Sequence, residues 1–267
     1  MVPQAPQLNS FMRSVSFDYS VVIPAYNEEE YLPSTLRSLD KVLRKIPQFR
    51  GEVIVVNNGS TDRTAQIAEQ YGAKVVEETN RGIGRARNRG AAMAKGETLI
   101  FLDADTWLCL PTLKTALEQI SNGICGGGGA LVKFDQHYGR LLSGMAMPAL
   151  WNFVSKTCRL AAGSFIFCRK KDFVEIGGFS ENLYAGEEIH FCLALKKILR
   201  KQKLPFLIID KHPVITSSRK LLWYKDHKIF LVLLTLLLFP FTVRYRKLCG
   251  FWYSRPPSSK EESHSNG

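Results

Sequence analysis

Two aspartates, Asp103 and Asp105, follow the apolar run TLIFL at 98–102 with a single alanine between them. Because alternate residues of an extended chain face the same side, their carboxylates can converge on one cation. Mg²⁺ and Mn²⁺ are hard ions that take carboxylate oxygens and keep positions open for phosphate. A divalent ion on a diphosphate stabilises the charge of a leaving group. The pair therefore predicts a Mg²⁺ or Mn²⁺ site, with an ordinary turn that closes a strand as the alternative.

Short apolar runs and helical patterns alternate over the first hundred residues. Runs rich in β-branched residues predict strands at 20–24, 52–57, 73–77 and 98–103. Apolar residues at helical spacing predict helices at 32–46 and 62–71, and small residues predict a third at 84–95; Gly72 and Gly96 end the last two. Further along the chain we expect strands at 130–134 and 164–169 and a helix at 187–197. Such alternation is typical of an α/β fold with a parallel sheet covered on both faces.

Ligands of parallel sheets bind at the carboxyl ends of the strands. The sequence places polar residues at those ends: Tyr26 and Glu28 after the first strand, Asn57 after the second, and the two aspartates after the fourth. The aspartates are therefore expected at the edge of the sheet where a ligand binds.

Four stretches together resemble glycosyltransferase family 2. They are "VVIPAYNEEEYLPSTLRSL", "VIVVNNGSTDRTAQIAEQYG", "NRGIGRARNRGAAMAKGETLIFLDADT" and "AGEEIHFCLALKK", and the resemblance extends over about 19–220. It implies a GT-A fold, a Rossmann-like and mostly parallel sheet flanked by helices. It also implies inverting transfer of a sugar from a nucleotide-diphosphate donor to an acceptor hydroxyl, with Mg²⁺ or Mn²⁺.

The resemblance assigns the nucleotide to the loop after the first strand. Pro24 and Ala25 open this loop, Tyr26 is implied to pack on the base, and Glu28 to meet the base or ribose. The family usually has aspartate where this chain has Asn57, and an amide offers a donor as well as an acceptor. Both a UDP-type and a GDP-type donor therefore stay open.

The diphosphate is assigned to a glycine-containing loop and to basic residues. Backbone N–H groups around Gly82 can approach phosphate, and Arg85 and Arg81 can form charge-assisted hydrogen bonds with it. In this resemblance Asp103 also contacts the donor, and Arg219, after the last core strand, occupies the place of a basic residue that touches the diphosphate. His212 is a weaker candidate for the metal shell, because a histidine before proline is more often a loop residue.

The predicted catalytic base lies in the stretch AGEEIHF. By the family pattern Glu188 deprotonates the acceptor hydroxyl, and crowding by Glu187 raises the pKa of Glu188 into a useful range. The family more often has aspartate at the second position. The alternative is an acidic start to a solvent-facing helix, which the helix dipole favours.

Positive charge is concentrated in the C-terminal part of the chain. Ten lysines and arginines against one acid lie at 211–260, so this segment carries +9 of the net charge of +12. These residues flank the apolar run IFLVLLTLLLFPFTV at 229–243, which is about 22 Å long as a helix against a bilayer core of about 30 Å. We expect an apolar membrane-associating helix that is interfacial or re-entrant rather than spanning, with a buried core helix as the bland alternative.

Four parts of the chain follow from these patterns. They are a flexible segment at 1–18, a GT-A domain at 19–218, a basic and apolar membrane-associating tail at 219–253, and a disordered tail at 254–267. The first twenty residues lack the apolar core of a signal peptide, and the six cysteines show no metal-ligand spacing and indicate reduced thiols. The expected location is the cytoplasmic face of a membrane, as a peripheral, re-entrant or single-pass protein.

Two other functions compete with sugar transfer. A sugar nucleotidyltransferase shares the α/β layout, but would want a glycine-rich basic loop after the first strand, where this chain has AYNEEE. A membrane-bound module that binds nucleotide sugars without chemistry is the second. Nucleic acid is not an expected partner, because the basic residues do not alternate with exposed aromatics. The acceptor is unknown, and the tail suggests one that is lipid-linked or close to a membrane.

Overall fold

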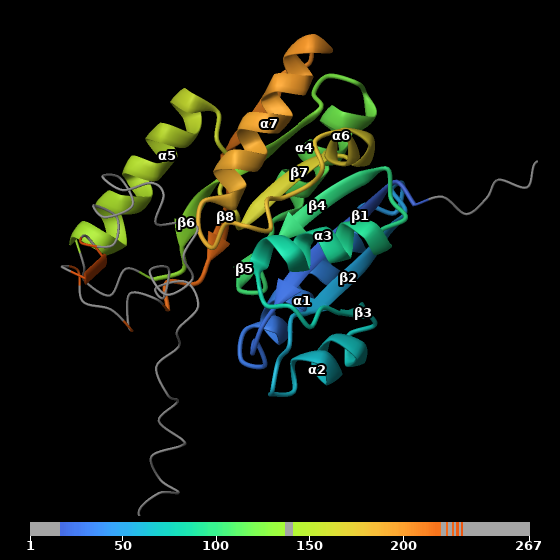
Figure 1. Cartoon of the computed structure of the whole chain (residues 1–267), viewed down its shortest axis with the longest axis vertical. Helices are drawn as coiled ribbons and strands as arrows, with labels where there is room; N and C mark the ends of the chain where they lie inside the picture. The colour runs from blue at the N-terminus through green and yellow to red at the C-terminus, as the bar shows by residue number, and fades with distance from the viewer. Residues whose placement is uncertain are drawn as a thin grey trace, which may run out of the picture.

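The computed structural model describes residues 17–136 and 141–219, together with Trp223, Asp226, Lys228, Ile229 and Leu231 (Figure 1). Nearly all of the predicted flexible segment at 1–18, most of the apolar run at 229–243 and the predicted disordered tail at 254–267 lie outside these residues. Within the described part of the chain, no helix has both the length and the hydropathy needed to cross a bilayer.

Eight strands and eight helical segments are described. The strands are β1 (Tyr19–Ala25), β2 (Gly51–Asn57), β3 (Lys74–Glu77), β4 (Thr98–Leu102), β5 (Thr106–Trp107), β6 (Gly127–Phe134), β7 (Phe165–Arg169) and β8 (Phe206–Thr216). The helices are α1 (Leu32–Leu43), α2 (Thr64–Gln70), α3 (Ile83–Met93), α4 (Leu110–Ser121), the π-helical turn η1 (Leu141–Ala146), α5 (Met147–Cys158), α6 (Lys170–Glu175) and α7 (Glu187–Lys201).

The strands form one sheet in the order β3-β2-β1-β4-β7-β6-β8-β5. The predicted parallel pairing is confirmed for β3, β2, β1 and β4. Beyond β4 the prediction of a mostly parallel sheet holds only in part, because β7 runs antiparallel to both β4 and β6, and β5 antiparallel to β8, while β6 and β8 are parallel. An apolar composition predicts that a strand is buried on both faces, but it does not predict whether the strand is parallel or antiparallel to its neighbours. The sheet is therefore mixed.

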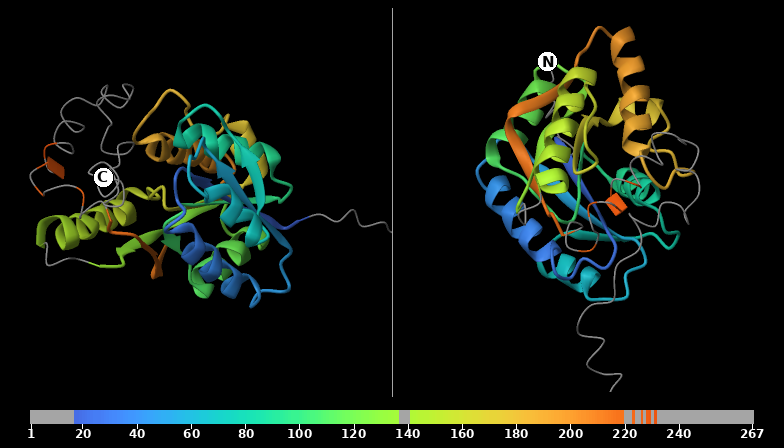
Figure 2. Two further views of the ribbon diagram at one scale, coloured as in Figure 1. Left: turned by 90° about the horizontal axis from the view of Figure 1, so that it is seen from below. Right: turned by 90° about the vertical axis from the view of Figure 1, so that its left-hand side faces the viewer.

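Helices cover both faces of the sheet, as the sequence predicts (Figures 1 and 2). On one face α1 and α4 bury their apolar stripes in one core cluster with residues of β1, β4, β6, β7 and β8, and α4 itself packs on β6, β7 and β8. On the other face α3, α6 and α7 pack around four phenylalanines, in which the Phe179 and Phe191 rings stack at 4.2 Å and Phe101 meets Phe179 edge-on at 4.9 Å. This aromatic cluster attaches the start of α7 to β4 and so fixes the two elements that carry the candidate acids.

Helix α3 lies unusually close to β1 because it carries Gly90 at the contact. A methyl group at Gly90 would stand 2.3 Å from Cγ1 of Val22, a distance that no packed side chain tolerates. Arg87 lies one turn earlier on the same helix and reaches Asp103, the residue after β4, at 3.1 Å.

Helix α5 lies at the edge of the molecule against β6 and β8 (Figure 1). The register of β6 against β8 shifts between Ala130 and Val132. The side chain of Asn152 pairs with the backbone of Val132 there: its amide nitrogen donates to the Val132 carbonyl (2.8 Å) and its oxygen accepts from the Val132 N–H (3.0 Å). Asn152 therefore holds one side of α5 against β6, and Leu150 and Phe153 on the outer side of the helix are 64% and 67% exposed.

Candidate active site

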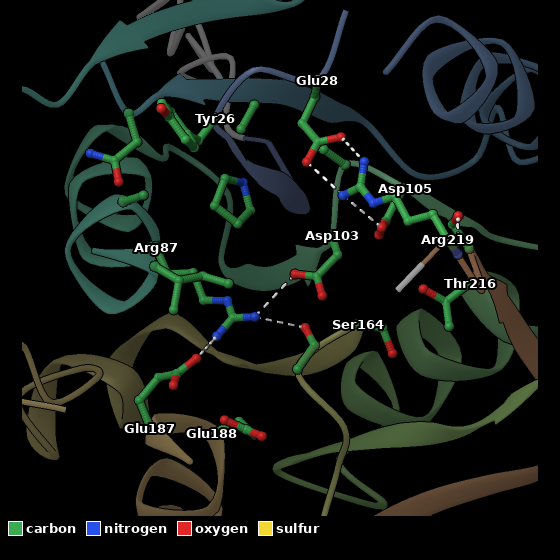
Figure 3. Close-up of a pocket in the computed structure, with 18 of the residues that line it drawn as sticks. Tyr26, Glu28, Arg87, Asp103, Asp105, Ser164, Glu187, Glu188, Thr216 and Arg219 are labelled. Carbon is green, nitrogen blue, oxygen red and sulfur yellow. Dashed lines mark hydrogen bonds and ion pairs between the residues drawn. The ribbon is translucent and has the colours of Figure 1, made fainter. Parts of the chain in front are cut away.

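A cavity of about 410 Å³ opens at the carboxyl ends of β1 and β4 (Figure 3). Most of the residues predicted to bind the donor, the metal or the acceptor line it: Pro24, Ala25, Tyr26, Glu28, Gly82, Asp103, Asp105, Glu187, Glu188 and Arg219. They come from segments far apart in the sequence, namely the β1 and β4 loops, the start of α3, the start of α7 and the end of β8. The sheet edge collects them as expected for strands that end together.

Asn57 and Arg85 do not line the cavity. Asn57 is opposite Glu77 in the β2–β3 register, and its amide donates to both carboxylate oxygens of Glu77 at 3.0 and 2.9 Å. Its neighbour Asn58 lines the cavity instead and accepts a hydrogen bond from the Gly82 N–H at 2.9 Å. Arg85 pairs with Glu181 at 2.8 Å.

Arg81 is the basic residue of the α3 loop that reaches the cavity. Its guanidinium lies 3.8 Å from the centre of the Tyr26 ring and donates to the Gly59 carbonyl. The two arginines suggested by the sequence as diphosphate partners thus separate, with Arg81 at the cavity and Arg85 on the flank.

The aspartate pair occupies a turn rather than a strand, which corrects the alternation argument. β4 ends at Leu102, and the Thr106 N–H donates to the Asp103 carbonyl at 3.1 Å to close the turn. Both carboxylates nevertheless reach the cavity, where each meets an arginine: Asp103 meets Arg87 at 3.1 Å and Asp105 meets Arg219 at 2.9 Å. The aspartates therefore lie at the edge of the sheet where the sequence places them, but in a turn and not in the extended strand that was predicted.

The two aspartates suit a metal that is shared with the donor. Among the described residues no three His, Cys, Asp or Glu groups come together to hold an ion. Mg²⁺ commonly uses one or two carboxylates and takes its other ligands from water and substrate phosphates, and Asp103 and Asp105 match that pattern. His212 is exposed on β8 and does not line the cavity, so the structure gives no support to a metal role for it.

Arg87 is a buried centre of the site that the sequence patterns did not single out. Only 1% exposed, it donates to Glu187 Oε1 (2.8 Å), Asp103 Oδ1 (3.1 Å) and the Gly163 carbonyl (3.0 Å) (Figure 3). Burial opposes its charge, but the carboxylates of Asp103 and Glu187 outweigh burial and raise its pKa. Arg87 therefore joins the aspartate turn to the acidic start of α7. The only sequence signal is a charged residue on the inward side of a small-residue helix.

Glu187 and Glu188 begin α7 but occupy different surroundings. Both line the cavity, but Glu187 is buried and paired with Arg87 at 2.8 Å, whereas Glu188 has no ion pair with Arg87 in the structure. Burial, and secondly the charge of Glu187, raise the pKa of Glu188 to about 8, and Arg87 opposes that shift. The helix dipole alone would favour the charged form, so burial outweighs it here. The crowding predicted for this pair is present in the structure.

Glu28 and Arg219 bind one another rather than standing apart. Arg219 donates from Nη1 to Glu28 Oε2 at 2.7 Å and from Nη2 to Glu28 Oε1 at 2.8 Å. Its guanidinium also lies over the Tyr31 ring at 4.6 Å. The sequence assigned Glu28 to the base or ribose and Arg219 to the diphosphate, and did not anticipate a pair between residues 191 positions apart.

Comparisons with known proteins identify the family of this chain. The profile described as Glycosyl transferase family 2 matches residues 20–177, more than half of the chain. Dolichyl-phosphate beta-glucosyltransferase of Drosophila melanogaster is 39% identical over 123 residues, 40% of this chain and 38% of that protein. Poly(ribitol-phosphate) beta-N-acetylglucosaminyltransferase TarS of Staphylococcus aureus is 38% identical over 108 residues, 38% of this chain and 18% of TarS. The matched part thus spans less than half of these relatives' own lengths.

Solved structures share the fold. Mannosyltransferase PcManGT from Pyrobaculum calidifontis, in complex with GDP-Man and Mn²⁺, has a TM-score of 0.61 at 18% identity, with 88% of this chain and 64% of that chain covered. S. aureus TarS 1-349 in complex with UDP-GlcNAc has a TM-score of 0.56 at 25% identity, with 76% of this chain and 59% of that chain covered. The α/β fold with its mixed sheet is the GT-A fold that the resemblance implied. With this architecture and a family profile that matches most of the domain, the chain belongs to glycosyltransferase family 2.

Proposed function

We propose that this protein transfers a sugar from a nucleotide-diphosphate donor to an acceptor hydroxyl, with inversion at the anomeric carbon. The observation that carries the proposal is one cavity that brings Tyr26, the Asp103–Asp105 turn and Glu188 together. The names of similar proteins support it, since PcManGT was solved with GDP-Man and Mn²⁺ and TarS with UDP-GlcNAc. Both a UDP-type and a GDP-type donor remain compatible with this cavity.

Each part of the cavity has a separate task in this mechanism. Tyr26 packs on the base, and Arg81, stacked on Tyr26, lies where it can neutralise the diphosphate. Asp103 and Asp105 would hold Mg²⁺ or Mn²⁺, which when bound stabilises the charge of the departing nucleoside diphosphate.

Glu188 accepts the proton of the acceptor hydroxyl as that oxygen attacks the anomeric carbon. The new C–O bond forms on the face opposite the breaking bond to the diphosphate, so the configuration inverts. Arg87 and Glu187 touch neither the hydroxyl nor the sugar in this scheme. They are positioning residues that orient Asp103 and keep the pKa of Glu188 within range.

Replacing Asp105 by alanine should remove metal-stimulated turnover, about 10²–10³-fold, the loss typical when one group that stabilises the transition state is removed. The measurement is donor consumption over a panel of UDP- and GDP-sugars with and without Mn²⁺. Asp40→Ala is the matched control, because Asp40 is an exposed aspartate on α1 that pairs with Arg44 one turn along the chain and does not line the cavity. Unchanged turnover in a folded Asp105→Ala protein would rule out the proposed role. Donor binding without turnover in the wild type would favour the non-catalytic module.

We also propose that the acceptor is lipid-linked and that the protein works at the cytoplasmic face of a membrane. In support, Leu150 and Phe153 form an exposed apolar side of α5, and Met147 at the start of that helix lines the cavity. The basic segment at 211–260 would favour an anionic surface. One relative is named a dolichyl-phosphate glucosyltransferase, an enzyme whose name contains a lipid phosphate.

Replacing Leu150 and Phe153 together by glutamate should lower binding of the full chain to vesicles severalfold, because both apolar contacts with the acyl region are lost. The measurement is flotation with vesicles that contain or lack phosphatidylserine. Val174→Glu on α6 is the control, since Val174 is 68% exposed on another helix. Equal flotation of the double variant and the wild type would show that α5 does not meet the bilayer.

A further inference from the structure

The end of β8 is tied to the aspartate turn by its backbone as well as by Arg219. The Ser217 N–H donates to the Asp105 carbonyl at 3.0 Å, and the Ser218 N–H donates to Asp135 Oδ1 at 2.8 Å. The Arg219 N–H in turn donates to Ser217 Oγ at 3.2 Å. The backbone that carries Arg219 is therefore held beside Asp105, and only the side chain can change partner easily.

Arg219 divides its donors unequally between two carboxylates (Figure 3). Nη1 serves Glu28 at 2.7 Å, while Nη2 is shared between Glu28 at 2.8 Å and Asp105 at 2.9 Å. A bidentate arginine–carboxylate pair is stronger than a single shared contact. The Asp105 contact is thus the one that Arg219 loses first.

Arg219 would keep other partners after losing Asp105. Its guanidinium lies 4.6 Å from the Tyr31 ring centre and 5.5 Å from that of Trp223, so two aromatic rings stabilise the cation in place. Loss of the Asp105 contact alone therefore leaves Arg219 paired with Glu28 and packed on both rings.

We propose that Arg219 is a positioning residue that competes with a divalent ion for the carboxylate of Asp105. When the ion binds, Arg219 releases Asp105 and stays paired with Glu28. This inference rests on the proposed metal site at Asp103 and Asp105. A guanidinium bonded to Asp105 repels a second cation there and withdraws one carboxylate oxygen from it. Before donor binding, Arg219 therefore weakens the ion's affinity for the site.

The test is Mn²⁺ binding without nucleotide, followed by the electron paramagnetic resonance signal of free Mn²⁺. Arg219→Met should bind Mn²⁺ roughly tenfold more tightly than the wild type, within the usual range of coupling between two ligands. Arg219→Lys should fall between them, because one ammonium group cannot reproduce the guanidinium fork that reaches both carboxylates. Arg44→Met is the matched control. Arg44 follows α1, is exposed, pairs with Asp40 at 2.8 Å and does not line the cavity, so Mn²⁺ affinity should stay at the wild-type value.

The outcomes separate the exchange from the metal site itself. Asp105→Asn should abolish the tight Mn²⁺ site with either residue at 219. If it does so while Arg219→Met and Arg219→Lys bind Mn²⁺ no more tightly than wild type, the exchange is refuted and Arg219 is only structural. If Asp105→Asn leaves Mn²⁺ binding unchanged, the metal site fails and the exchange fails with it. If circular dichroism shows that Arg219→Met does not fold, Arg219→Lys is the test by itself. Tighter Mn²⁺ binding than wild type supports the exchange, and unchanged binding refutes it.

Discussion

Replacing Glu188 by glutamine should lower kcat by about 10²–10⁴-fold, the contribution of a positioned general base. Glutamine has nearly the same shape but cannot accept the proton of the acceptor hydroxyl. Donor affinity should change little, because the donor contacts proposed here lie at Tyr26, Arg81 and the aspartate turn. Steady-state transfer assays and titration of the variant with UDP or GDP measure the two quantities separately.

Glu188→Asp is the conservative control for this result. It keeps a carboxylate, one methylene shorter, and should retain part of the activity that glutamine loses. A Glu188→Gln protein with wild-type kcat would show that another group removes the proton.

The pH profile follows from the surroundings of Glu188. Its pKa of about 8 means that the base form accumulates as pH rises, so kcat should climb through a limb near pH 8. Glu187→Gln removes a like charge and should move this rise in kcat to lower pH.

The raised pKa of Glu188 also affects stability. Because the folded-state pKa lies above the ordinary value of 4.5, the stability linked to this proton is present below pH 4.5 and lost as pH rises towards 8.

Replacing Arg87 by methionine should destabilise the protein by about 3–5 kcal/mol, the cost of removing one partner from a buried ion pair. Glu187 would remain buried without its cation, and Asp103 would lose the contact that orients it. Thermal unfolding monitored by circular dichroism measures the loss. A fall in Tm of roughly 10 °C is expected for a chain of this size.

Arg85→Met on the same helix is the control for this prediction. Arg85 pairs with Glu181 at 2.8 Å on a partly exposed flank, where an ion pair contributes only about 0–1 kcal/mol. Adding Glu187→Gln to Arg87→Met should recover part of the lost stability, because it removes the unpaired charge. Equal Tm values for Arg87→Met and Arg85→Met would contradict the central role given to Arg87.

Local periodicity was sufficient for the N-terminal half of the fold. The strands at 20–24, 52–57, 73–77 and 98–103 appear as β1 to β4, because a chain buried on both faces must be apolar along its length. Elements after Leu110 were less visible: α4, α5 and α6 were not predicted. α5 shows why, since its sequence MPALWNFVSKTC carries apolar residues on both its packed and its exposed side.

By itself the sequence determined the family, the approximate positions of the N-terminal strands and the residue types that gather near their carboxyl ends, because these depend on spacing over a few positions. Tertiary structure decided which partner each charge takes. Arg87 reaches Glu187 across 100 positions and Arg219 reaches Glu28 across 191, whereas Asn57 turns to the adjacent strand and leaves the cavity to Asn58. A buried charge pairs with whatever opposite charge the fold brings within hydrogen-bonding distance, and no local pattern in the chain encodes that distance.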